Sequence, residues 1–311
     1  MREQRGRAAL LSICCVLPLL AAAASGAPPK TIDALITACP STAEIAQFQR
    51  DLRISFEKDP SQAERCGMTL LRERGYQALR VLKTVRFTKP LPWTKRTLYG
   101  WFTHAVRGVR FRGDLDTSFC CSPKRTIDIE ALYMEALADP SCGWLNGKGE
   151  DSLAAPLIDV VHEARHAEGP LHTCRAVDDA TLAEGGAWAV EIMLEVWLGL
   201  YSTSFFDART QRDRYRDAVL RAAQADMDRI CELPIANVSV RLDGITAIVR
   251  NGGGVPLRHV WLASDVGPPY DLRAVAAKSS VRVRLASRPA WLRVVGTASD
   301  PKPRDNVLLR R

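Results

Sequence analysis

Three of the chain's five histidines fall within eleven residues, and their spacing constrains the fold more than any other feature. The stretch runs from His162 and Glu163 to His166 and continues through Gly169 to His172. Residues four apart lie on one face of a helix, one turn from each other, so His162 and His166 can bind a single ion. Glu163 projects beside that face, where a carboxylate can take a proton from water. The spacing therefore predicts a helix with a metal site at its end.

Apolar residues predict the same helix independently. Leu157, Val160, Val161 and Ala164 form an apolar stripe within residues 154–168, and Gly169 with Pro170 ends the pattern. Because glycine adopts a left-handed conformation readily, the chain can turn back there and bring His172 to the ion as a third ligand.

The complete pattern H-E-x-x-H-x-x-G-x-x-H resembles the zinc-binding motif of the metzincin metallopeptidases at every fixed position. The resemblance implies a zincin-like fold with Zn²⁺ as cofactor, His162, His166 and His172 as ligands, and Glu163 as the general base. Metzincins also place a methionine in a tight turn beneath the zinc. The next methionine here, Met193, lies in a helical pattern instead.

A second candidate ligand lies further along the chain. The stretch from Thr181 to Glu191 resembles the second active-site helix of the gluzincins, in which the third zinc ligand is a glutamate followed by glycine. Under that resemblance Glu184 completes the site, and His172 lies beside the ion without binding it. Glu191 is a candidate to orient a histidine through a hydrogen bond. Both third ligands stay open at this point.

The N-terminus has the features of a signal peptide. Arg2, Arg5 and Arg7 precede an apolar run from Ala8 to Ala24, and small residues follow it. We therefore expect residues 1–26 to be removed and the protein to be exported, with no stable membrane span after removal.

Seven cysteines remain after the leader, and the oxidising environment outside the cytoplasm permits disulfides. Their odd number leaves at least one thiol unpaired within the chain, and the sequence leaves the pairing open. Cys142 and Cys174 bracket the histidines. The seven are Cys39, Cys66, Cys120, Cys121, Cys142, Cys174 and Cys231.

Residues 27–234 are expected to form an α+β catalytic domain that is mainly helical with a small sheet. Ser41 and Glu44 have the spacing of a helix-capping box. Residues 31–75, 178–201 and 207–231 have helical patterns, and residues 81–87, 108–111 and 126–129 have short strand patterns. We expect the strand near Thr126–Glu130 to be an edge strand that binds substrate.

The sequence changes character after Pro234. Short alternating segments separated by Gly and Pro predict a small all-β sandwich over residues 235–300, followed by a basic tail over 301–311. Residues 235–311 contain 13 basic and 5 acidic residues, a surplus of 8 that equals the net charge of the whole chain.

These features predict an exported zinc metallopeptidase that acts on a peptide or protein substrate and binds no nucleic acid. The alternative is an exported metal-containing binding protein without catalysis. In that case the basic β-module would contact an anionic surface or cell-wall polymer, with Arg282, Arg284, Arg288 and Arg293 as candidate contacts.

Overall fold

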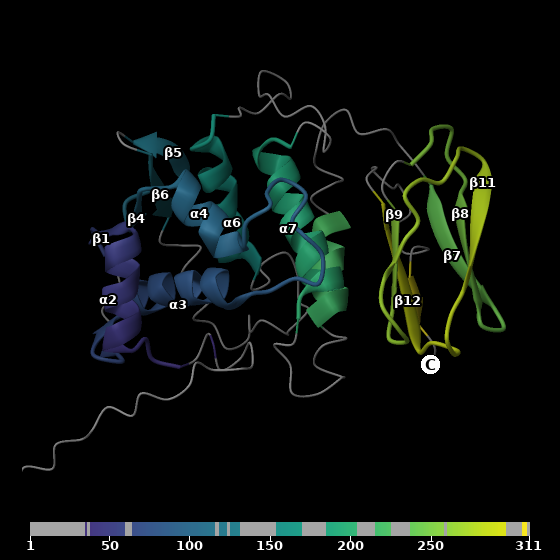
Figure 1. Cartoon of the computed structure of the whole chain (residues 1–311), viewed down its shortest axis with the longest axis horizontal. Helices are drawn as coiled ribbons and strands as arrows, with labels where there is room; N and C mark the ends of the chain where they lie inside the picture. Colours follow the sequence, from purple (N-terminus) through teal and green to yellow (C-terminus); the bar gives the residue numbers. More distant parts are fainter. Residues whose placement is uncertain are drawn as a thin grey trace, which may run out of the picture.

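The computed structural model shows an α+β chain in two parts, a helical part with a small mixed sheet and a part made of strands (Figure 1). The structure describes residues 35, 38–59, 64–115, 118–122, 125–130, 154–169, 185–203, 215–224, 237–257, 260–296 and 307–309. The expected leader, residues 1–26, lies outside them. No helix within these ranges is both long and apolar enough to cross a bilayer.

Four strands form the sheet of the helical part. They are β1 (Arg53–Glu57), β4 (Gly108–Arg112), β6 (Thr126–Glu130) and β5 (Phe119–Ser122), in that spatial order. The first three run parallel, and β5 runs antiparallel to β6. Our prediction that Thr126–Glu130 is an edge strand is therefore wrong, because this strand has a partner on each side. The edge next to it is β5.

Within the described ranges α6 packs on β5 and β6, α2 packs on β1, and the other helices pack on these two or on each other. The helices are α2 (Thr42–Asp51), α3 (Leu70–Thr84), α4 (Leu98–Ala105), α6 (Ala154–His166) and α7 (Ala187–Tyr201). Residues 215–224 are also helical, and a small hairpin joins β2 (Glu64–Arg65) to β3 (Met68–Thr69). The capping box of Ser41 and Glu44 begins α2, as predicted.

Two of the local predictions are wrong. Residues 81–84 complete α3 rather than forming a strand, and residues 53–57 are a strand within a region expected to be helical. In both cases the short apolar pattern fits a helix or a strand equally well, and long-range packing decides between them.

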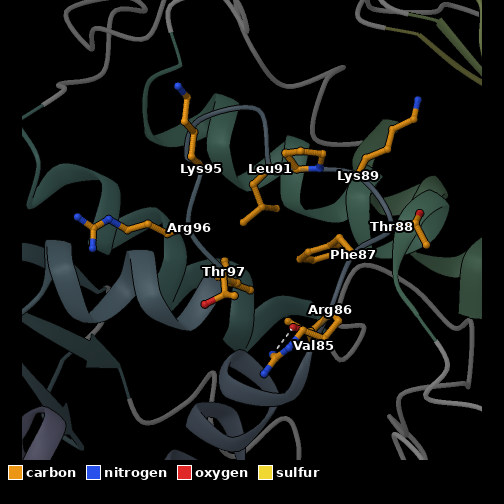
Figure 2. Close-up of a pocket in the computed structure, with 11 residues that line it drawn as sticks. Val85, Arg86, Phe87, Thr88, Lys89, Leu91, Lys95, Arg96 and Thr97 are labelled. Carbon is orange, nitrogen blue, oxygen red and sulfur yellow. Dashed lines mark hydrogen bonds between the residues drawn. The ribbon is translucent and has the colours of Figure 1, made fainter.

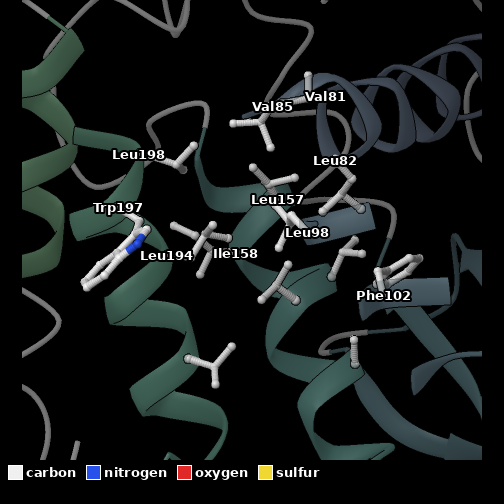
Figure 3. Packing of buried hydrophobic residues seen from close by; sticks show 14 of the residues in the cluster. Val81, Leu82, Val85, Leu98, Phe102, Leu157, Ile158, Leu194, Trp197 and Leu198 are labelled. Atoms are coloured by element: carbon white, nitrogen blue, oxygen red, sulfur yellow. The ribbon is translucent and has the colours of Figure 1, made fainter. Parts of the chain in front are cut away.

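The core of the helical part lies where α3, α4, α6 and α7 meet (Figure 3). Each of these elements contributes a buried side chain to the core. They are Val85 just after α3, Leu98 of α4, Leu157 of α6 and Leu194 of α7. In α7 every residue except Trp188 is buried, so this helix is apolar nearly all round. The helix that carries the histidines is therefore held between other helices and the sheet.

The C-terminal part is a sandwich of two antiparallel sheets with its own core. One sheet has the order β10-β9-β12-β13, and the other has the order β11-β8-β7. The tail expected over residues 301–311 is wrong in part, because β13 pairs with β12. The strands are β7 (Val238–Asp243), β8 (Thr246–Asn251), β9 (Val260–Ser264), β10 (Tyr270–Asp271), β11 (Ser279–Arg284), β12 (Trp291–Gly296) and β13 (Val307–Leu309).

The two parts share a packed contact. Trp261 of β9 stacks edge to face on Trp197 of α7, with ring centroids 6.1 Å apart. Arg293 of β12 is 6% exposed and donates to Asp217 in the helical segment 215–224 at 2.5 Å. Arg293 is therefore a structural residue, and our prediction that it contacts an anionic partner is wrong.

Replacing Asp217 with Asn should destabilise the protein by about 1–3 kcal/mol, because a buried guanidinium would lose its charged acceptor. Thermal or denaturant unfolding measures the change. Asp271→Asn is the matched control, since the pair between Asp271 and Lys89 is exposed on both sides. That control should stay within about 0.5 kcal/mol of the wild type. Equal effects of the two variants would show that the pair of Arg293 and Asp217 stabilises the protein no more than the exposed pair of Lys89 and Asp271.

Cys39 and Cys66 form a disulfide, which confirms that the chain uses disulfides. Cys120 and Cys121 are neighbours on β5. Cys142, Cys174 and Cys231 lie outside the described residues, so their pairing stays open.

Candidate metal centre

His162 and His166 meet on one face of α6, as their spacing predicts. Their Nε2 atoms are 3.2 Å apart, and the two rings lie edge to face with centroids separated by 4.9 Å. His162 is only 8% exposed and is also stacked edge to face with Trp188 of α7 at 5.1 Å. Two imidazole nitrogens that face each other at this distance share either a proton or a cation.

Glu191 of α7 fixes the tautomer of His162. Its Oε2 lies 2.8 Å from His162 Nδ1, and both side chains are buried. Because a carboxylate accepts hydrogen bonds, Nδ1 carries the proton and Nε2 keeps its lone pair. That lone pair is directed at His166. A carboxylate behind a histidine is the usual support of a metal-binding imidazole.

The separation of the two nitrogens suits zinc. Zinc binds histidine nitrogen at about 2.0–2.1 Å in a tetrahedral site. Two such nitrogens lie about 3.3 Å from each other, close to the 3.2 Å between His162 and His166. The donor set is also chemically suitable, because neutral imidazole is a preferred zinc ligand.

Glu163 is poised differently from the histidines. Its side chain is 6% exposed, and the backbone N–H of Cys120 on β5 donates to its carboxylate. The Oε2 atom is buried without a hydrogen-bond partner in the part of the chain that the structure describes. Burial, assisted by the negative charge of Asp159, raises the pKa of Glu163 to about 8. The Glu163 carboxyl group therefore binds a proton readily, and its Oε2 atom can accept that proton.

Asp159 lies one turn before Glu163 and belongs to the same acidic surroundings. It accepts a hydrogen bond from Ser118 at 2.5 Å, and Ser118 Oγ in turn accepts from the backbone of Glu130 at 2.9 Å. Burial raises the pKa of Asp159 to about 7, and Glu191 contributes. The histidine pair is thus bordered by several carboxyl groups that are costly to ionise without a nearby cation.

These shifts predict that the metal-free protein loses stability as the pH rises from about 4.5 to about 8. The native state keeps protons on Glu163 and Asp159, whereas burial lowers the pKa of His162 to about 4 and keeps it neutral. In the unfolded state the two carboxyl groups are ionised and the imidazole binds a proton at the acidic end of the range. Over the whole range the native state therefore binds more protons, and raising the pH disfavours it. Urea unfolding in the presence of a chelator at pH 5 and pH 8 measures the difference. Equal or greater stability at pH 8 would contradict the prediction.

The helix ends as the glycine predicts. Gly169 has a φ of +109°, and its N–H donates to the carbonyl of His166 at 2.9 Å. Arg165 pairs with Glu168 at 2.5 Å, three residues further along the chain. Its Nε also donates to the carbonyl of Gly185 at 2.7 Å, which ties the end of α6 to the start of α7.

Both candidate third ligands, His172 and Glu184, lie outside the described residues. Among the residues that are described, no group of three or more His, Cys, Asp or Glu side chains forms a metal site. The structure therefore brings together His162, His166 and Glu191 and leaves the third ligand as a prediction. Met193 is buried in α7, so it belongs to a helix as expected.

Glu191 is the residue whose role the sequence indicated only faintly. It lies 29 residues from its partner His162, and nothing local in the sequence signals the contact. Ser118 and Asp159 were missed as partners for the same reason, since they meet across 41 residues. Only the packing of α6 on β5, β6 and α7 brings these groups together.

Replacing Glu191 with Gln should weaken zinc binding by about 10–100-fold, because an amide oxygen supports the His162 imidazole less well than a carboxylate. Competition with a chromophoric chelator measures the affinity. Glu195→Gln, one turn further along α7 and more deeply buried, is the control and should change the affinity less than threefold. If the two variants bind zinc equally, Glu191 does not orient the histidine.

A hollow of about 290 Å³ lies elsewhere, between the end of α3 and the start of α4 (Figure 2). Phe87 and Leu91 point toward its middle, whereas the charged ends of Lys89, Lys95 and Arg96 point away from it (Figure 2). None of the candidate metal ligands lines this hollow. It is therefore separate from the histidine site.

No protein-family model, curated protein or solved structure matches this chain.

Proposed function

We propose that this chain is an exported zinc-dependent metallopeptidase. The observation that carries the proposal is the pair of Nε2 atoms of His162 and His166, 3.2 Å apart on consecutive turns of a buried helix. Glu191 supports it, because this carboxylate accepts from Nδ1 of His162 and so leaves the lone pair on Nε2, the atom that faces His166. His162 and His166 would hold the zinc with His172 or Glu184 as the third protein ligand.

Bound zinc lowers the pKa of water to about 7 and polarises a carbonyl group. The residues of the chain supply the remaining parts of the reaction. Glu163 has a buried oxygen without a hydrogen-bond partner among the described residues, and its raised pKa suits a group that takes a proton and passes it on. In peptide hydrolysis that proton goes from water to the leaving amine. Cys120 N–H holds the carboxylate in place while the proton moves.

The substrate would bind beside β5 rather than β6. Among the described strands β5 pairs with β6 alone, and its residue Cys120 contacts Glu163. An extended peptide can add to such an edge by backbone hydrogen bonds. Phe119 on the same strand is 39% exposed, the one large apolar side chain with that exposure in the described part of the chain. This favours a substrate with an apolar side chain near the bond that is cut.

The test is cleavage of an unfolded protein substrate by the purified mature chain with and without a chelator. We expect cleavage that stops after chelation and returns when about one equivalent of Zn²⁺ is added. The metal content of the purified protein is measured in parallel. A protein that binds zinc with the expected stoichiometry but cleaves no peptide bond in a broad set of substrates would overturn the peptidase assignment.

A further inference from the structure

The outer face of the β11-β8-β7 sheet carries four arginines in a fixed array. In register across the sheet, Arg241 on β7 and Arg282 on β11 both lie opposite Ile248 of the central strand β8. Arg250 follows two residues later on β8, and Arg284 lies two residues from Arg282 on β11. All four arginine side chains are exposed. We name Arg241, Arg250, Arg282 and Arg284 the arginine face.

The alternation of burial shows that these residues share one side of the sheet. Val240, Val249 and Val283 point inward and belong to the sandwich core. Ile248 points the other way, yet it is only 4% exposed and belongs to neither core cluster. Its two cross-strand neighbours are Arg241 and Arg282, and arginine can lay its aliphatic stem on an apolar neighbour while its charged end stays in water.

None of the four guanidinium groups has an ion pair within the described ranges. Neighbouring strands lie about 4.8 Å apart, so Arg241 and Arg282 are about 10 Å from each other, and Arg282 and Arg284 are about 7 Å apart. Asp243, at the end of β7, is the one acidic residue on this side of the three strands. Like charges this close repel each other, and an anionic chain laid across the face would relieve that repulsion.

Two hydroxyl groups lie among the arginines. Ser239 of β7 and Ser280 of β11 flank Arg250 on either side in the register of the sheet. A guanidinium binds an oxyanion with two parallel hydrogen bonds, and a serine hydroxyl both donates and accepts. Together they offer charged contacts to acidic groups and neutral contacts to hydroxyl groups. A sugar chain that carries acidic groups presents both.

The surroundings of the face argue against a bilayer as its partner. In Figure 1 the β11-β8-β7 sheet is the layer of the sandwich farther from the helices. Phe119 is the one exposed large hydrophobic residue among those the structure describes, and it belongs to the helical part. A surface that inserts into lipid normally adds apolar side chains to its charges. The arginine face has none.

We propose that the arginine face binds an acidic polysaccharide. Binding would hold the exported protein on a carbohydrate surface through the sandwich, and it would not use the histidine site. The inference is therefore independent of the proposed peptidase activity.

The test measures binding of the intact mature protein to a labelled heparin oligosaccharide, an acidic sugar chain, at near-physiological salt. The double variant Arg282→Gln/Arg284→Gln should bind at least tenfold more weakly. Lys95→Gln/Arg96→Gln removes the same charge from an exposed site elsewhere (Figure 2) and should stay within twofold of the wild type. Unfolding midpoints confirm that both variants are folded. Equal losses in the two double variants, or no loss in either, would overturn the proposal.

A second comparison separates sugar from other polyanions and from lipid. Ser239→Ala/Ser280→Ala should weaken heparin binding severalfold and leave binding to inorganic polyphosphate unchanged. Chelation of zinc should change neither. If polyphosphate or anionic phospholipid vesicles bind as tightly as heparin and the serine variant binds all of them like the wild type, the face does not recognise a polysaccharide.

Discussion

Glu163→Gln is expected to lower the rate of peptide hydrolysis by at least about a thousandfold while the protein keeps its zinc. The amide has nearly the shape of the carboxylate and can still accept from the backbone N–H of Cys120. It cannot take up a proton, so a general base worth about 10²–10⁴ in rate is lost. Because His162, His166 and Glu191 are unchanged, the metal content should stay at the wild-type value. Activity on a peptide substrate and zinc content are measured on the same preparation.

The control for this variant is Glu168→Gln, five residues further along the chain. Glu168 is exposed and accepts from Arg165 and from Trp101, so its carboxylate is directed away from the histidines. Its replacement should change the rate less than about threefold. If Glu163→Gln retains most of the activity, Glu163 is not the base. If it loses zinc as well as activity, its role is structural.

The local pattern around the histidines was predictable because each part of it depends on near neighbours. The apolar stripe of α6, the capping box of Ser41 and Glu44, and the turn at Gly169 are all set by residues within one or two turns of the chain. The pairing of His162 with His166 follows from helix geometry alone.

What could not be predicted depends on contacts between distant segments. The sequence indicated the strand Thr126–Glu130 but not that β4 and β5 lie on either side of it, because alternation reports a strand and not its neighbours. In the sequence, Arg293 could not be told apart from the exposed arginines before it. Its burial follows from the packing of β12 against residues 215–224, which no local signal encodes.

The candidate site divides along the same line. The two histidines and Glu163 come from one helical turn and its neighbour, and the sequence placed them together. Glu191 joins them only because α7 packs along α6. Residues that support a site from behind are therefore the ones that a sequence pattern identifies least well, although they determine which nitrogen of a histidine is free to bind an ion.

The second large effect concerns the third zinc ligand. We expect wild-type protein to bind one zinc per chain, His172→Ala to lose most of it, and Glu184→Ala to retain it. His172 is favoured because the positive φ of Gly169 ends α6 directly after His166, and His172 follows that turn by three residues. Removing one of three protein ligands typically lowers zinc affinity far more than removing a supporting residue. The measured quantity is the number of zinc ions per chain after dialysis at equal free zinc, and it is compared across all variants.

His162→Ala is the positive control for this measurement. His162 belongs to both proposed ligand sets, so this variant must lose its zinc whichever set is right. Loss of zinc in Glu184→Ala with retention in His172→Ala would reverse the assignment, because the ligand would then come from the segment just before Gly185, which Arg165 binds. Retention of zinc in both single variants and loss only in the double variant would mean that either side chain can complete the site. Retention of zinc even in the double variant would contradict both proposed sets of three protein ligands. The third ligand would then be another residue of the chain.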